Sequence, residues 1–191
     1  MKKQLDKDEA LGVIEKVPYG EPSVCCHRMV VQVKANGSLR RTVDMSSLNR
    51  HSLRETHHVK PPFQQAKAIP RNTWKSVTDA RDGYHSVPFR VEDRYLTTFI
   101  TPWVRYRYCV APQGATISGD AYSRRYDDII VDVERKTKCV DDTALWDEEL
   151  EDHWWRMLDF LELVGRNGVT LNFHKLQFAQ RGIDFAGFHV T

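Results

Sequence analysis

The sequence predicts an α+β fold in which an antiparallel sheet of the split β-α-β kind carries its helices on one face. The first observation is the order of elements after residue 73: strand, helix, hairpin, helix and strand, which is the order of a split β-α-β unit. The second is that two long segments have the spacing of amphipathic helices. The third is that acidic residues end the short apolar runs, at residues 79 and 141–142.

Two long helices are predicted in this half of the chain. The first spans about 118–133, where residues of one face recur at steps of three and four: Ile117, Ala121, Tyr122, Arg125, Ile129 and Val133. The second spans about 148–165 and ends at Asn167-Gly168. Its predicted buried stripe consists of Leu150, Trp154, Met157, Leu158, Leu161 and Val164. Trp154 and Trp155 are therefore interpreted as packing residues, with a platform for stacking bases as the alternative.

The remaining elements are short. Residues 5–15 are helix-compatible up to a break near Gly12, and residues 62–70 form a short helical piece bounded by prolines. Strands are predicted over 25–34 and 39–45, joined by the hairpin signal Asn36-Gly37, and over 74–79, 85–89, 96–110, 176–180 and 183–190.

Composition excludes several classes of protein. The chain has 191 residues, of which 41% are hydrophobic and 28% charged, as in an ordinary globular domain with a core. A net charge of +2 does not by itself indicate a nucleic-acid partner. No apolar run reaches the roughly 20 residues that span a bilayer, and the first residues lack a secretory signal. We expect an intracellular protein of the cytoplasm or nucleus, not secreted and with no membrane partner.

The cysteines do not have the spacing of a zinc finger. Cys25 and Cys26 are adjacent and no C-x2-C unit exists. A zinc site assembled from Cys25, Cys26, His27, His57 and His58 is the less favoured alternative to reduced cysteines that fill strands.

The acidic residues carry the chemistry. Asp79 ends the apolar run 74–79, and Asp141-Asp142 lie between two short apolar runs, as at the tip of a hairpin. If folding brings these acids together, they form a carboxylate cluster able to hold two Mg²⁺ ions, the arrangement used for nucleotidyl transfer. Taken alone, Asp141-Asp142 is more typical of a solvated turn than of a metal site.

Several blocks, in order, resemble the fingers and palm of a reverse transcriptase of the gypsy class of long-terminal-repeat retrotransposons. They cover roughly residues 5–191: Gly12-Val13-Ile14, residues 34–40 with Val43-Asp44 and Leu48-Asn49, residues 77–85, Pro112-Gln113-Gly114, Val140-Asp141-Asp142, and Leu171-Asn172 with Lys175, Phe178 and Phe185-Ala186-Gly187. The chain departs from the family pattern at Cys139, where an aromatic residue is usual, and at residues 118–121.

The resemblance implies a domain organisation. Residues 1–73 are expected to form a partial fingers subdomain with an N-terminal helix. Residues 74–191 are expected to form the palm, with fingers strands inserted around 85–110. Thumb, connection and ribonuclease H regions are expected to be absent, so that the chain is expected to be a fragment of a larger polyprotein or part of a decayed element.

The resemblance also implies the catalytic residues. Asp79 and Asp142 are expected to bridge two Mg²⁺ ions, with Mn²⁺ as an alternative, and Asp141 to be the third acid. Adjacent carboxylates raise each other's pKa, and a bound cation offsets that repulsion.

Further site residues follow from the same resemblance. Those expected to bind the incoming nucleotide are Lys34, Arg40, Asp82, Gly83, Tyr84 and Gln113. The residues expected to form the hairpin that positions the primer end are Phe185, Ala186 and Gly187. A guanidinium suits phosphate oxygens, and the Tyr84 ring is expected to exclude a 2′-hydroxyl. Without the resemblance, Arg40 is typical of a solvated ribbon residue and Tyr84 of a core tyrosine.

The expected function is that of an RNA-directed DNA polymerase domain. Its partners are expected to be an RNA or DNA template with its primer, deoxynucleoside triphosphates, and the rest of the polyprotein, including thumb, ribonuclease H and integrase. Template binding should depend on phosphates and duplex shape. One alternative is a catalytically inactive, truncated or degenerate binding module that keeps the palm. A second is an unrelated enzyme with an acidic site, such as a nuclease.

Overall fold

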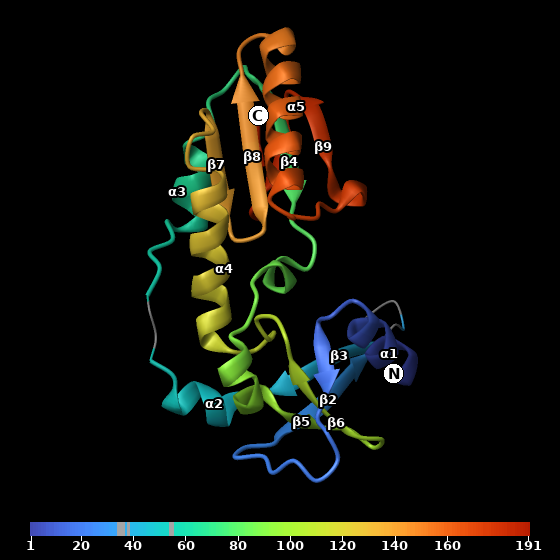
Figure 1. The fold of residues 1–191 in the computed structure, drawn as a ribbon. Coiled ribbons are helices and arrows are strands. Elements are labelled where there is room, and N and C mark those ends of the chain that lie inside the picture. Colours follow the sequence, from blue (N-terminus) through green and yellow to red (C-terminus); the bar gives the residue numbers. More distant parts are fainter. Residues whose placement is uncertain (34–36, 38, 54–55) are drawn as a thin grey trace. The chain divides into compact units, whose positions relative to one another are not determined.

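The computed structural model describes residues 1–33, 37, 39–53 and 56–191. The chain divides into two compact units (Figure 1). The first unit consists of residues 1–56 and 84–122, and the second of residues 57–83 and 123–191. None of the helices in the described part of the chain combines the length and the apolar character that crossing a lipid bilayer requires.

The first unit is built on a five-stranded sheet of order β1-β6-β5-β2-β3, in which β2 and β5 pair in parallel. Its elements are α1 (Lys2–Ala10), β1 (Ile14–Lys16), β2 (His27–Val33), β3 (Leu39–Asp44), α2 (Ser46–His51), η2 (Val91–Thr97), β5 (Phe99–Ile100) and β6 (Arg105–Tyr108). Aromatic residues of neighbouring strands fill its core: Phe99 stacks on Tyr106 at 5.9 Å between ring centroids.

The second unit contains the predicted split β-α-β sheet, of order β7-β8-β4-β9, with all neighbours antiparallel. Its elements are α3 (Pro62–Lys67), β4 (Trp74–Asp79), β7 (Lys136–Cys139), β8 (Asp142–Asp147), α5 (Leu150–Arg166), η3 (Phe173–Lys175), β9 (Gln177–Gln180), β10 (Ile183–Phe185) and β11 (Phe188–Val190). Helix α4 (Thr116–Ile129) begins in the first unit and ends in the second, and η1 (Gly83–Ser86) also spans a boundary. The predicted α+β class is confirmed.

Helices α4 and α5 cover the same face of this sheet. Thr78 of β4 pairs with Thr143 of β8, and the hydroxyl of Thr143 donates to Tyr126 of α4 at 3.0 Å. Ser76, two residues before Thr78, therefore points to the same face, and it contacts His153 of α5 at 2.7 Å. Figure 1 shows α5 lying over β8, β4 and β9.

The opposite face of the sheet carries a small apolar cluster. Val77 of β4 and its partner Ala144 of β8 are buried there against α3 and the β10–β11 hairpin, which contributes Ile183 and Phe185. Side chains two residues apart on a strand point to the same face. Asp79 lies two residues after Val77, and Asp142 lies two residues before Ala144, so both acids belong to this face.

Two predicted strands are wrong. Residues 183–190 form two strands, not one, because Ala186 and Gly187 both have positive φ (51° and 84°), as in the two-residue turn of a hairpin. Residues 85–89 make only an isolated bridge between Pro88 and Val110, since a proline has no N–H with which to continue a ladder.

The predicted helices exist, but their buried faces differ from the prediction. The first ends at Ile129 rather than 133, and its buried residues are Ser118, Asp120, Tyr122, Ser123 and Tyr126. The second buries His153, Met157, Phe160 and Val164. Four residues of its predicted stripe are substantially exposed: Leu150 (46%), Trp154 (48%), Leu158 (40%) and Leu161 (37%).

Candidate active site

Asp79 and Asp142 face each other across two hydrogen-bonded strands. Asp79 is the last residue of β4, Asp142 is the first residue of β8, and the two are register partners in the antiparallel pair. Side chains directly opposite in such a pair have Cβ atoms about 5 Å apart. The pairing of distant segments therefore places two carboxylates side by side at the end of the sheet.

Asp141 lies in the turn of the β7–β8 hairpin. Cys139 and Asp142 are paired, so Val140 and Asp141 form a two-residue loop. Val140 has φ of +54°, a conformation that a β-branched residue rarely adopts and that costs of order 1–3 kcal/mol. The turn is held against β4, since the N–H of Ala80 donates to the carbonyl of Asp141 at 2.8 Å.

A cation already contacts one of the two acids. The ammonium of Lys175 lies 2.7 Å from Oδ2 of Asp79, whose side chain is 13% exposed. Backbone contacts bring the preceding segment alongside, because the N–H of Asn172 donates to the carbonyl of Asp79 at 2.8 Å. The motif Leu171-Asn172 with Lys175 thus lies next to the strand that carries Asp79.

The pKa values of Asp142 and Lys175 are both raised in this arrangement. Burial and then the charge of Asp79 raise the pKa of Asp142, while Lys175 lowers it. The hydrogen bond with Asp79 raises the pKa of Lys175. Two carboxylates at close range repel each other, and a cation between them relieves the repulsion.

The oxygen donors fit a divalent cation of the hard, oxygen-preferring kind. In the described part of the chain, however, no three carboxylate, imidazole or thiol groups are grouped closely enough to hold a metal ion. The structure therefore shows a pair of facing acids with Asp141 beside them and a lysine on Asp79, rather than a finished three-acid cluster.

Two of the expected nucleotide-binding residues follow Asp79 in the second unit. Asp82 has φ of +52° and its exposed carboxylate lies 3.6 Å from the guanidinium of Arg81. Gly83 is buried at the start of η1. The backbone before them is fixed, because the N–H of Arg81 donates to the carbonyl of Thr170 at 2.7 Å.

Three others belong to the first unit. Arg40 is exposed on β3, where it pairs with Gln32 of β2. The ring of Tyr84 packs on Tyr122, with 5.5 Å between ring centroids. Gln113 precedes Gly114, which has φ of +102° and whose carbonyl accepts a hydrogen bond from Asn49 at 2.9 Å.

Lys34 lies outside the described residues, as do parts of the predicted Asn36-Gly37 turn. The expected primer-positioning residues form the β10–β11 hairpin of the second unit. Phe185 is buried in the apolar cluster with Val77 and Ala144, and Ala186 and Gly187 form the turn.

Sequence reasoning missed the contact between Lys175 and Asp79. The signal for it was present, because Lys175 belongs to a motif that was singled out, although without a role. It also missed the buried contacts of Ser76, His153 and Asp147, for which no sequence spacing gives a signal.

Comparison with known proteins identifies the family to which the chain belongs. The family described as "Reverse transcriptase (RNA-dependent DNA polymerase)" matches residues 27–190. The chain belongs to this reverse transcriptase family.

Particular relatives support the gypsy class. The chain is 24% identical over 198 residues to the "Retrovirus-related Pol polyprotein from transposon gypsy" of Drosophila melanogaster, which matches 99% of this chain and 18% of the polyprotein. The predicted resemblance to a gypsy-class reverse transcriptase is confirmed. The chain thus spans about a fifth of that relative's length.

Solved structures share the fold. The foamy viral protease-reverse transcriptase dRH in complex with double-stranded DNA has a TM-score of 0.92 and 18% identity, over 100% of this chain and 33% of the other. The foamy viral protease-reverse transcriptase in complex with an RNA/DNA hybrid has a TM-score of 0.91 and 18% identity, over 100% of this chain and 25% of the other.

Proposed function

We propose that the chain is the polymerase portion of a retrotransposon polyprotein and adds deoxynucleotides to a primer 3′ end on an RNA template. The observation that carries the proposal is the register pairing of Asp79 with Asp142 in a chain of the reverse transcriptase family. This pairing juxtaposes two acids that are far apart in sequence.

The proposed role of Asp79, Asp141 and Asp142 is to hold two Mg²⁺ ions. Bound there, the ions would activate the primer hydroxyl and neutralise the triphosphate. The chain's own contribution is positional: the β4–β8 pair fixes Asp79 opposite Asp142, and the short turn fixes Asp141 beside them. Lys175 bonds to Asp79 and compensates its charge.

The proposed nucleotide site uses the residues named from the family pattern. Arg40 and Lys34 would bind the triphosphate, and the backbone of Asp82 and Gly83 would lie near it. Tyr84 would limit the space at the 2′ position of the sugar. The packing of Tyr84 on Tyr122 supports this role, because a ring held by a buried neighbour can act as a fixed wall.

Gln113 would contact the nucleotide and template, and the hairpin of Phe185, Ala186 and Gly187 would position the primer end. The hairpin is suited to this role because Phe185 anchors it in the apolar cluster while its turn remains at the surface. In this proposal the first unit serves as fingers, and the second as palm.

The proposed partners are a template–primer duplex, deoxynucleoside triphosphates and the remaining parts of a polyprotein. The two foamy viral structures with this fold are complexes with double-stranded DNA and with an RNA/DNA hybrid. They support a nucleic-acid duplex as the partner of this chain too.

Primer extension tests the proposal. The chain is incubated with an RNA template, a labelled DNA primer, deoxynucleotides and Mg²⁺, and Asp142→Asn is compared with Asp128→Asn. Asp128 is an exposed carboxylate on α4 outside the acid pair. We expect Asp142→Asn to abolish extension and Asp128→Asn to retain it.

A second readout separates the polymerase from the inactive binding module. Binding of Mn²⁺, followed by electron paramagnetic resonance, should be weakened by Asp142→Asn and unchanged by Asp128→Asn. Metal binding without extension would favour the inactive binding module over the polymerase. Extension by Asp142→Asn at the native rate would refute the assignment of the acids.

A further inference from the structure

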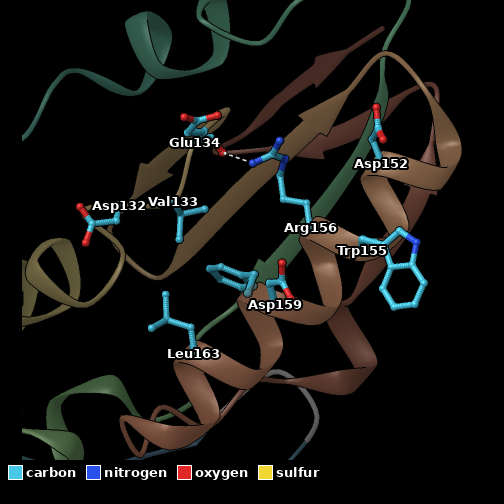
Figure 2. A pocket seen from close by; sticks show the side chains of 9 residues that line it. Asp132, Val133, Glu134, Asp152, Trp155, Arg156, Asp159 and Leu163 are labelled. Carbon is cyan, nitrogen blue, oxygen red and sulfur yellow. Dashed lines mark hydrogen bonds between the residues drawn. The ribbon is translucent and has the colours of Figure 1, made fainter.

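A groove lies on the outer flank of α5, away from the facing acids. It has a volume of about 490 Å³ and runs between α5 and residues 132–134, which precede β7 (Figure 2). Its lining includes the buried ring of Phe160, the half-buried Val133 and Leu163, and the ring of Trp155, which is 58% exposed. The groove therefore offers apolar surface, including a large indole, to a ligand.

Carboxylates surround this apolar surface. Two of them, Asp132 and Glu134, come from the segment before β7, and two, Asp152 and Asp159, come from α5. All four residues are exposed, and among the described residues none of these carboxylates takes part in an ion pair. The negative charge is thus available to a ligand.

The one arginine that lines the groove does not cancel this charge. Nε of Arg156 donates to both carboxylate oxygens of the buried Asp147, at 2.9 and 3.0 Å. Figure 2 shows its guanidinium also directed to the backbone carbonyl of Glu134. Arg156 is therefore engaged with Asp147, and the charge that the groove presents is negative.

The charge pattern decides the class of ligand. Phosphates of a nucleic acid would be repelled by the four carboxylates, so the groove is not an extension of a template-binding surface. A single metal ion does not fit either, because no three acids in the described chain are grouped closely enough to hold one. A ligand with several spaced cations and apolar side chains matches both features.

We propose that this groove binds a basic protein segment that carries arginine or lysine together with large apolar side chains. An apolar side chain would cover Val133 and Leu163 beside the ring of Trp155, and cationic groups would pair with Asp152, Asp159 and the acids opposite. Arginine combines both properties, because its stem packs on an aromatic ring while its guanidinium binds carboxylates. The chain uses this contact internally, where Arg181 lies 4.0 Å from the ring centroid of Trp74.

A binding measurement on the full chain tests the proposal. The probe is a short fluorescein-labelled peptide of alternating arginine and leucine, and fluorescence anisotropy is recorded at low salt. A matched peptide with glutamate in place of arginine should not bind. Asp152→Asn/Asp159→Asn should weaken binding of the basic peptide about tenfold, since two partly exposed ion pairs are lost.

A matched double variant controls for overall charge. Asp128→Asn/Glu151→Gln removes the same two charges at exposed positions outside the groove, and it should change affinity less than about twofold. Trp155→Ala should weaken binding about fivefold, since an aromatic anchor is lost. Circular dichroism checks that each variant is folded.

Three results would overturn the proposal: no binding of the basic peptide to the native chain, equal weakening by the two double variants, or no effect of Trp155→Ala. The proposal does not involve Asp79 or Asp142, so loss of primer extension in Asp142→Asn with unchanged peptide binding would leave the groove assigned as stated.

Discussion

The hydroxyl of Ser76 lies 2.7 Å from Nε2 of His153, in the interior of the second unit. Nδ1 of the same ring lies 3.1 Å from Oδ2 of Asp147, and all three residues are fully buried. With the ring proton on Nδ1 toward the carboxylate, Nε2 accepts the Ser76 hydroxyl, which itself accepts the N–H of Ala179 at 3.0 Å. Serine, histidine and aspartate are arranged as in a hydrolase, yet no substrate can reach them. Their role is structural: they tie β4, β8, α5 and β9 together.

This burial predicts a pH dependence of stability. Burial lowers the pKa of His153 below its ordinary value, although the contact with Asp147 opposes the shift. The unfolded chain therefore binds a proton on His153 at a higher pH than the folded chain does. The free energy of unfolding should be highest above pH about 6.5 and should decrease as the pH falls below it.

The measurement is urea unfolding at pH 7.5 and 5.5, in the native chain and in His153→Gln. In His153→Gln the free energy of unfolding should fall less between pH 7.5 and pH 5.5 than in the native chain, because glutamine does not titrate. His174, which is exposed on η3, provides the control, and His174→Gln should keep the native difference. An identical pH dependence in native and His153→Gln chains would contradict the prediction.

Asp147 should be the most sensitive acidic residue to substitution. It accepts hydrogen bonds from His153, Arg135 and Arg156, and none of its surface is exposed. Asp147→Ala would leave these donors without their carboxylate, and breaking a buried ion pair costs about 3–5 kcal/mol. Asp184→Ala, at an exposed carboxylate that contacts His189, should change the free energy of unfolding by less than about 1 kcal/mol. Chemical denaturation checks both values, and similar losses in the two variants would argue against the prediction.

Asp142→Asn should stabilise the metal-free chain. Like charges directly opposite in a sheet are destabilising, and neutralising one should add about 0.5 kcal/mol to the free energy of unfolding. With Mn²⁺ the native chain should become more stable than Asp142→Asn, because a cation bound by the intact acid pair stabilises the native fold. Thermal unfolding with a chelator and then with excess Mn²⁺ measures both effects. A variant that is less stable than the native chain without metal would contradict the repulsion inferred here.

Tyr84 should determine which sugar is accepted. Tyr84→Ala opens space in front of Tyr122, so incorporation of ribonucleotides relative to deoxynucleotides should rise at least about tenfold, as for other pockets that lose a steric wall. Tyr84→Phe keeps the ring and should keep the native selectivity. Primer extension with each nucleotide type gives the ratio of ribonucleotide to deoxynucleotide incorporation. An unchanged ratio in Tyr84→Ala would show that Tyr84 does not exclude the 2′-hydroxyl.

The parts of the fold that could be predicted are those with local signals. The apolar run at residues 74–79 is a strand with the same bounds in the structure, and the two long helices lie close to their predicted positions. The strand expected at 85–89 failed because Pro88 interrupts the ladder. Residues 183–190 were expected as one strand although Gly187, a residue type that favours turns, lies in the middle of that range.

The buried face of α5 could be predicted only in part: Met157 and Val164 are buried as expected, but His153 and Phe160 were not in the predicted stripe. Apolarity alone favoured Leu150, Trp154, Leu158 and Leu161, whereas the helix buries His153, which finds partners in Asp147 and Ser76. A buried histidine requires hydrogen-bond partners, and these come from distant positions. The facing acids were expected because Asp79 and Asp142 lie in two motifs that occur in the same order in the family that the chain resembles. The lysine on Asp79 depends on the path of residues 170–175, for which periodicity carries no information.

The strand pairing that joins Asp79 to Asp142 closes a loop of more than sixty positions. During synthesis on the ribosome, the two carboxylates cannot come together until β8 has left the ribosome and paired with β4. Closing such a long loop costs conformational entropy, and contacts between distant residues tend to form slowly. We therefore expect the acid pair to form later in folding than the local contacts of the helices and hairpins.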